Sequence, residues 1–226
     1  MVAASGGVVY VAWTSSASTD PASTAPRTIW FRWNNGNGAP SRWSTPIRLT
    51  PATGRVDRPR IAAYGSNVYV AYTDMVTGWI QVRISRDYGR HWVTRAVGRT
   101  TRTGPGGRAG APAVAASRTN VAVSWISTDA GAIRMRWSSD RGYSWYAANA
   151  VGTGAVSGSS ASIAMVAERI VIGWTTPTGY AVRIRDFRWG YRPWPGTVYW
   201  HQTAIIGPSA DAERTYERVG LGQVAA

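Results

Sequence analysis

The chain repeats one short pattern four times, and this repeat constrains the fold more than any other feature of the sequence. In each copy, Val or Ile alternates with other residues and the segment ends in an aromatic residue; the copies are Val9–Trp13, Val68–Tyr72, Val121–Trp125 and Ile170–Trp174. Alternation with a period of two and a high content of β-branched residues predict strands. One supersecondary unit therefore recurs along the chain.

Each copy is accompanied by three further predicted strands. A strand of small residues precedes it, at Val2–Ser5, Ile61–Tyr64, Val114–Ser117 and Ile163–Val166. A third strand follows with Arg in a fixed column, at Arg32, Arg83, Arg136 and Arg183, and a fourth strand comes next, as at Val93–Val97. Four strands in units of roughly 50 residues indicate a β-propeller. We predict an all-β fold, a β-propeller of four-stranded antiparallel blades with small residues on the crowded inner strands.

The repeats are expected at about residues 2–60, 61–113, 114–162 and 163–223 of a single propeller domain or segment, with a fifth repeat beginning at 224. Two arrangements are open. Four blades close on themselves and the last strand overlaps the first, or the chain is a segment of a larger propeller. In a segment, the remaining blades or a protein partner would cover the chain-terminal edges near Val2–Ser5 and Gly220–Ala226.

The turn after the third strand carries S-x-D-x-G-x-x-W in two repeats. The matching residues are Ser85, Asp87, Gly89 and Trp92, and Ser138, Asp140, Gly142 and Trp145. Asp can accept hydrogen bonds from its own loop, Gly can adopt a positive φ, and we expect Trp to be largely buried under the hairpin. The motif resembles the Asp-box (BNR) repeat of sialidases and related propellers. That resemblance implies that Asp87 and Asp140 fasten turns and are not a catalytic pair.

The same resemblance raises the hypothesis of a sialidase, which has an Arg triad, a Tyr nucleophile activated by Glu, and an Asp acid/base. The chain has only Glu168, Glu213 and Glu217, and it lacks the Arg-Ile/Leu-Pro motif of the first triad Arg. We therefore expect no catalytic residues. The alternative set is Asp57, Glu213 and Tyr216, with Asp57 expected in an exposed loop ahead of the second inner strand.

The charge is strongly basic: 25 Arg and no Lys against 11 acidic residues give a net charge of +14. Coding bias towards Arg explains this excess as well as function does. If the charge acts, it favours anionic ligands such as acidic glycans, and Arg32, Arg83, Arg136 and Arg183 are the candidate anion-contacting residues. No recognisable nucleic-acid-binding motif accompanies it, so we expect no sequence-specific binding of nucleic acid.

The small number of Cys and His residues and the lack of long apolar segments exclude several kinds of site. The chain has no Cys and two His, which excludes a disulfide scaffold, a thiolate site and a centre with three His from one chain. We expect no metal and no cofactor. No apolar run reaches the roughly 18 residues of a transmembrane helix, and no signal peptide is visible. The resemblance implies an extracellular or cell-surface location.

The sequence thus predicts a non-catalytic module that binds or scaffolds, with protein partners or acidic glycans as its ligands. A sialidase-type glycoside hydrolase, or its propeller portion, is the first alternative. An accessory structural subunit of a larger assembly is the second.

Overall fold

The computed structural model describes residues 1–16, 25–100, 111–127, 131–155, 160–166, 169–177, 179–186 and 201–206. These residues form four antiparallel sheets of four strands each, and a three-residue 3₁₀ turn, η1 (Pro40–Arg42), is the one helical element among them. The prediction of an all-β propeller with four-stranded blades is confirmed. The described part of the chain contains no helix with the length and hydropathy needed to cross a membrane.

Each blade is built from consecutive strands joined as hairpins, so that sequence order equals spatial order within the sheet. Blade 1 contains β1 (Val2–Ser5), β2 (Val8–Ser16), β3 (Arg27–Asn34) and β4 (Ile47–Arg48). Blade 2 contains β5 (Val56–Tyr64), β6 (Asn67–Asp74), β7 (Trp79–Ser85) and β8 (Val93–Arg99). Blade 3 contains β9 (Ala113–Ser117), β10 (Asn120–Ile126), β11 (Ile133–Ser138) and β12 (Asn149–Gly152). Blade 4 contains β13 (Ser162–Val166), β14 (Arg169–Thr176), β15 (Gly179–Asp186) and β16 (His201–Ile206).

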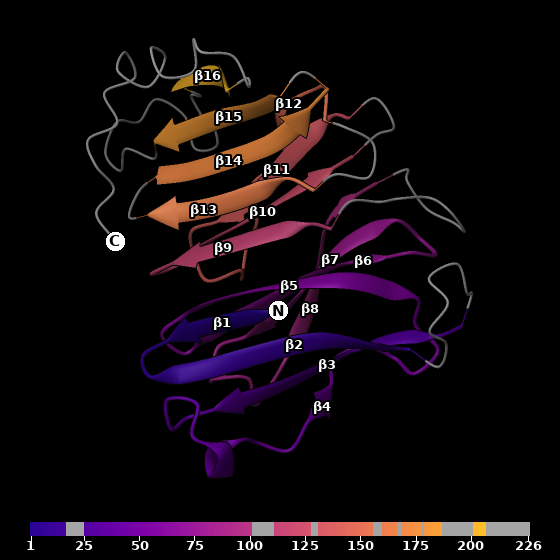
Figure 1. The fold of residues 1–226 in the computed structure, drawn as a ribbon, viewed down its shortest axis with the longest axis vertical. Helices are drawn as coiled ribbons and strands as arrows, with labels where there is room; N and C mark the ends of the chain where they lie inside the picture. Colours follow the sequence, from indigo (N-terminus) through magenta and orange to yellow (C-terminus); the bar gives the residue numbers. More distant parts are fainter. Residues whose placement is uncertain are drawn as a thin grey trace.

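The first strands of successive blades lie against one another, β1 with β5, β5 with β9, and β9 with β13 (Figure 1). They are the inner strands of the propeller. Their small residues, such as Ala62 and Ala116, allow this close approach, as the sequence predicted. Blade 1 and blade 4 lie at opposite ends of the molecule in Figure 1.

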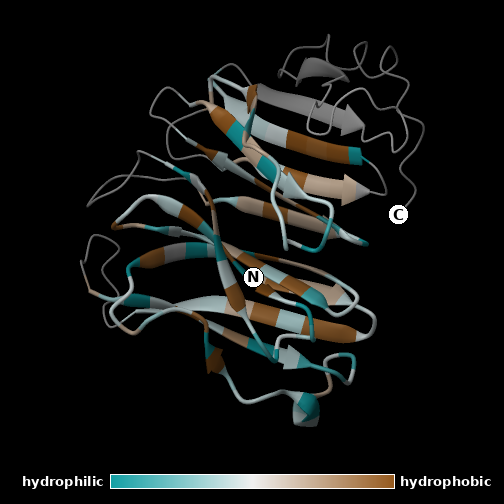
Figure 2. Ribbon diagram, turned by 180° about the vertical axis from the view of Figure 1, so that it is seen from behind, coloured by the Kyte–Doolittle hydropathy of each residue, from teal (hydrophilic) through white to brown (hydrophobic). Residues whose placement is uncertain are grey.

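The hydrophobic core lies between blades, because alternate residues of one strand point to opposite faces of its sheet. In β6, Val68 and Val70 pack towards blade 1, whereas Tyr69 and Ala71 pack towards blade 3. A third cluster, containing Met135 and Ile172, joins blades 3 and 4. Figure 2 shows hydrophobic residues along the strands and polar residues at many of the turns.

No hydrophobic cluster of the described residues joins blade 1 to blade 4. The described blades therefore form an open arc. Residues 223–226, which would begin a fifth repeat, lie outside the described residues, so the choice between a closed propeller and a segment stays a prediction.

The inner strand of blade 2 begins earlier than the expected start at Ile61. Strand β5 starts at Val56, and Asp57 pairs with Thr73 of β6, so the expectation that Asp57 lies in a loop is wrong. The register shifts between Asp57 and Arg60, which marks a bulge that contains Pro59. Proline lacks the N–H of a regular ladder, and a bulge tolerates it, so the strand continues across it.

Candidate functional site

The blades have two ends with different chemistry. In blade 2, the hairpin of Tyr64 and Asn67 lies beside Ser85, whereas Val56 pairs with Asp74 at the far end of the strands. The end that carries the turns of Asp87 and Asp140 is called the turn end here. Asp57 and its neighbours lie at the opposite end.

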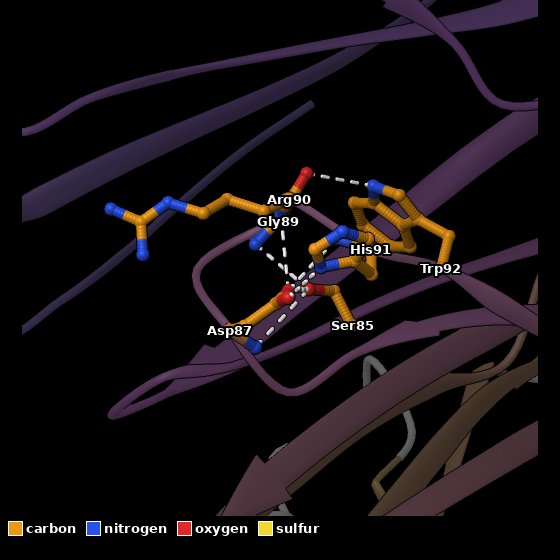
Figure 3. A network of polar contacts seen from close by, with 6 residues as sticks. All are labelled: Ser85, Asp87, Gly89, Arg90, His91 and Trp92. Carbon is orange, nitrogen blue, oxygen red and sulfur yellow. Dashed lines mark hydrogen bonds and ion pairs between the residues drawn. The ribbon is translucent and has the colours of Figure 1, made fainter.

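The Asp87 turn is held by a network of hydrogen bonds (Figure 3). The Ser85 hydroxyl donates to Asp87 Oδ1 over 2.8 Å and accepts from the backbone N–H of Gly89 over 2.8 Å. Asp87 Oδ1 also accepts from the backbone N–H groups of Arg90, at 3.1 Å, and His91, at 2.9 Å. The carboxylate therefore binds donors of its own loop, as the sequence predicted for this residue type.

The Asp140 turn repeats this geometry in blade 3. The Ser138 hydroxyl donates to Asp140 Oδ1 over 2.7 Å and accepts from the N–H of Gly142 over 2.8 Å. Asp140 Oδ1 accepts from the N–H of Ser144 over 2.9 Å. Two turns with the same motif thus use the same atoms.

Blade 1 forms a related turn with a sequence, Asn34–Gly38, that keeps the Gly of the motif but not its Ser and Asp. Asn34 ends β3, as Ser85 ends β7, and its Oδ1 accepts from the N–H groups of Gly36 at 2.8 Å and Gly38 at 3.0 Å. Its position in the sequence could have indicated this role. Asn34, Ser85 and Ser138 each lie two residues after the Arg of the third strand, and each provides a side-chain acceptor.

Both turn carboxylates are held in the ionised form. Burial acts to raise the pKa of Asp87, but hydrogen bonds from the His91 backbone, the His91 ring and Ser85 lower it to about 2. The pKa of Asp140 is also lowered: burial acts against this, and hydrogen bonds from Ser144 and Ser138 prevail. Carboxyl groups of such low pKa are poor general acids near neutral pH.

Trp92 connects its turn to the preceding blade. It is half-buried, its indole N–H donates to the Gly89 carbonyl over 2.9 Å, and its ring meets Phe31 of blade 1 edge-on at 4.9 Å. The indole bond places Trp92 against its own turn with most of its surface covered, as the sequence predicted, and the contact with blade 1 comes in addition. Trp145 is likewise half-buried, and it packs against the cluster shared by blades 2 and 3. Each turn thus fastens its blade to the one before it.

The Arg column ties the third strand to the outer segment of the same blade. Each described member is half-buried and donates to an acceptor 10 to 12 residues further along: Arg32 Nε to Ser44 O, Arg83 Nη1 to Thr94 Oγ1, and Arg136 Nε to Tyr146 O. Arg183 lies in β15, and its side chain is outside the described part. Contact of these four arginines with an anion stays a prediction.

Two arginines lie close together at the opposite end, on the bulge of β5. Arg58 has a positive φ of 50°, which is uncommon for a residue with a side chain. Arg60 is half-buried, and burial first, then the charge of Arg58, lower its pKa. Asp57 precedes them on the strand, whereas Glu213 and Tyr216 lie outside the described residues. Of the alternative catalytic set, the structure therefore places Asp57 alone.

The same end carries an exposed indole that sequence reasoning missed. Trp79 begins β7 and is 42% exposed, and the Arg99 guanidinium lies 5.8 Å from its ring centre. The two residues are direct cross-strand partners. An aromatic residue at the start of the third strand, opposite an Arg of the fourth, could therefore have indicated this pair from the sequence.

No protein-family model matches the chain, and no curated protein sequence matches it. Among solved structures, it resembles Trypanosoma rangeli sialidase in complex with sialic acid, with a TM-score of 0.52 and 11% identity over 81% of this chain and 35% of that chain. The same sialidase in complex with 2,3-difluorosialic acid, as a covalent intermediate, gives a TM-score of 0.53 and 13% identity over 81% and 35%. The α-L-arabinofuranosidase PaAbf62A from Podospora anserina gives 0.47 and 12% over 86% and 65%.

The chain spans about a third of the length of the sialidase that it matches. At 11–13% identity this likeness shows the fold, which is that of a sialidase-like β-propeller.

Proposed function

We propose that the chain is a non-catalytic Asp-box β-propeller module that binds acidic glycans at the end opposite the Asp87 and Asp140 turns. The observation that carries this proposal is the pair Arg58 and Arg60 on the bulge of β5. Two like charges are held together there, and the charged form of Arg60 is disfavoured by burial and by Arg58. A bound carboxylate would relieve both costs.

The chemistry of the pair suits a sugar acid. A guanidinium presents paired N–H donors that match a carboxylate, and such charge-assisted bonds are roughly twice as strong as neutral ones. Trp79 and Arg99 at the same end offer an apolar ring face and a further cation.

The test is titration of the full chain with 3′-sialyllactose and, for comparison, with lactose. We expect binding of sialyllactose alone, weakened at least tenfold in Arg60→Gln. Arg90→Gln is the matched control, because it removes the same charge from an exposed residue at the turn end. Equal weakening by both substitutions, or equal binding of both sugars, would contradict a carboxylate site on β5.

We also propose how the repeats are organised and where the module acts. The Asp87 and Asp140 turns are Asp boxes, and the repeats span about 2–60, 61–113, 114–162 and 163–223 of one propeller domain. The module acts outside the cell or at its surface. The hydrogen-bond geometry common to the two turns supports the first of these statements.

A sialidase-type glycoside hydrolase is the second candidate, favoured by the place of Asp57 beside Arg58 and Arg60 on an inner strand. A fluorogenic sialoside tests it. We expect no turnover by the full chain, because the sequence lacks the Arg motif of the first triad position. Turnover that disappears in Asp57→Asn, Glu213→Gln or Tyr216→Phe would replace the binding module with an enzyme.

A further inference from the structure

The turn after β3 holds two Asn-Gly pairs in succession. They are Asn35–Gly36 and Asn37–Gly38, and they directly follow the buried Asn34. The side chains of Asn35 and Asn37 are both exposed. Asparagine is among the chemically labile residues of proteins. A following Gly increases this lability, because it has no Cβ to hinder the approach of its backbone nitrogen to the Asn side chain.

The reaction of such a pair is deamidation. The backbone nitrogen of the Gly loses its proton and bonds to Cγ of the Asn. The Cγ–Nδ2 bond breaks, and the amide nitrogen leaves with that proton as ammonia, so that a cyclic imide remains. Water then opens the ring: cleavage at Cγ gives aspartate, and cleavage at the main-chain carbonyl carbon gives isoaspartate. The nucleophile is therefore the backbone nitrogen of Gly36 or Gly38, and the co-reactant is water.

One side chain binds both of these nitrogens. Asn34 Oδ1 accepts hydrogen bonds from the N–H of Gly36 at 2.8 Å and from the N–H of Gly38 at 3.0 Å. An amide oxygen has two lone pairs, so these two bonds use its full accepting capacity. The Asn34 amide group donates to Ala39 O over 2.6 Å, which fixes the orientation of the side chain. Each nucleophile thus keeps its proton in a hydrogen bond and is not free to turn to the neighbouring side chain.

We propose that Asn35 and Asn37 are deamidation sites and that Asn34 is the positioning residue that keeps their reaction slow in the folded chain. Reaction then requires local opening of the turn, which releases Gly36 or Gly38 from Asn34. Either product adds a negative charge to a strongly basic chain, and isoaspartate also lengthens the main chain by a methylene group. The proposal does not depend on the glycan site, which lies at the opposite end of the blades.

Water reaches this position of the turn even where another blade precedes it. Asn37 has a φ of 51° and corresponds to Tyr88 in blade 2 and Arg141 in blade 3, whose φ values are 63° and 62°. Tyr88 is 40% exposed, and Arg141 is exposed too, although each belongs to a blade that packs on a preceding one. The exposure of Asn37 is therefore a property of the turn itself.

The other two turns show what a smaller side chain can bind. Ser85 occupies the position of Asn34, and its Oγ accepts from the N–H four residues further on at 2.8 Å but from the N–H two residues further on at 3.4 Å. In blade 3, the same two bonds of Ser138 measure 2.8 and 3.3 Å. Serine at this position therefore binds the later N–H well and the earlier one weakly, whereas Asn34 binds both.

Peptide mass spectrometry of the full chain, incubated at mildly alkaline pH in buffer and in guanidinium chloride, measures deamidation at each Asn. Labelling by an isoaspartyl methyltransferase reports the isoaspartate. We expect Asn35 and Asn37 to react at least tenfold more slowly in the folded chain, and Asn34→Ala to remove most of this protection at both sites. Asn34→Ser should keep Asn37 protected, whereas Asn35 should react as fast as in Asn34→Ala.

Ser138→Ala is the matched control, because it removes the equivalent acceptor from the turn of blade 3. It should leave the rates at Asn35 and Asn37 unchanged. Circular dichroism checks that the variants fold, and if Asn34→Ala does not fold, the two rates in Asn34→Ser decide. The proposal would be overturned by equal rates in the folded and unfolded chain, by equal acceleration of both sites in Asn34→Ser, or by the same acceleration in Ser138→Ala.

Discussion

The backbone of the two fastened turns is alike residue by residue. Both place a non-glycine residue in the left-handed region, Tyr88 with a φ of 63° and Arg141 with a φ of 62°, directly before the turn Gly. The N–H groups of these two residues donate to Ser66 O at 2.9 Å and Thr119 O at 2.7 Å, across the neighbouring hairpin. These bonds help to hold a conformation that costs about 1 kcal/mol for a residue with a Cβ. The Asp carboxylate satisfies donors further along each turn.

Removing the Asp87 carboxylate should therefore weaken the fold in a pH-dependent way. At pH 7 we expect Asp87→Ala to lower the free energy of unfolding by about 1 kcal/mol. The loss is modest because water can replace the carboxylate as the hydrogen-bond acceptor for the backbone N–H groups of the turn. The folded pKa of about 2 lies below the usual value of 3.8, so the stabilisation by ionised Asp87 is present above pH 4 and is lost as the pH falls towards 2. Urea unfolding between pH 7 and pH 2 measures this loss.

Asp87→Asn is the matched variant for that experiment. It keeps the Oδ1 acceptor and loses the titrating group, so its stability should fall less than that of the wild type over the same pH range. Parallel curves for the two proteins would show that another group causes the acid dependence.

At the scale of the element, each blade is a sheet with two differently used faces, and the turn adds a second attachment to the preceding blade. A Cβ on Gly89 would overlap the Phe31 ring of blade 1, and one on Gly142 would lie 2.8 Å from Ile84 Cδ1 of blade 2. The turn glycine therefore provides both a positive φ and a close approach between blades.

Gly89→Ala should destabilise the chain more than Gly38→Ala. Both glycines have a φ of 90°, so both substitutions strain the backbone, but nothing lies within 4 Å of a Cβ at Gly38. Displacing Phe31 should add about 1–3 kcal/mol to the cost at Gly89. Chemical unfolding of the two variants measures the difference. Equal losses would mean that the blade contact contributes nothing beyond the backbone term.

Sequence reasoning predicted the elements better than their partners. Period-two alternation and turn residues were enough for the strands and for the Asp87 network, because both are local. The contact of Trp92 with Phe31 was missed, since periodicity assigns a side chain to a face without saying which blade that face meets. The copy at Asn34–Gly38 looked degraded because a motif compares residue types, whereas the turn requires only a side-chain acceptor, which Asn34 provides. The start of β5 at Val56 was not predicted, because the bulge at Pro59 interrupts the period-two alternation by which a strand is recognised.

At the scale of the whole molecule, charge opposes compactness. The 25 basic residues exceed the 11 acidic ones on a chain of 226 residues, and an excess of one sign destabilises the folded state through self-repulsion. Hydrophobic contact between blades has to outweigh this repulsion.

Salt should therefore raise the melting temperature of the dilute chain. We expect an increase of about 3 °C between low salt and 0.5 M NaCl, corresponding to about 1 kcal/mol of screened repulsion. Thermal unfolding followed by circular dichroism at low protein concentration measures it, and repeating the scan at two concentrations separates screening from association. A decrease with salt would mean that attractive ion pairs dominate the charge distribution.

The packing of Gly89 and Trp92 on Phe31 also suggests an order in which the blades fold. The Gly89 turn of blade 2 packs against Phe31 of blade 1, and the ribosome synthesises blade 1 before blade 2. During synthesis, each new blade thus emerges when the preceding blade can already be folded. In refolding from denaturant, all blades start unfolded together, so this order is lost. Translation itself would then guide the assembly, because each blade packs on the blade that was synthesised before it.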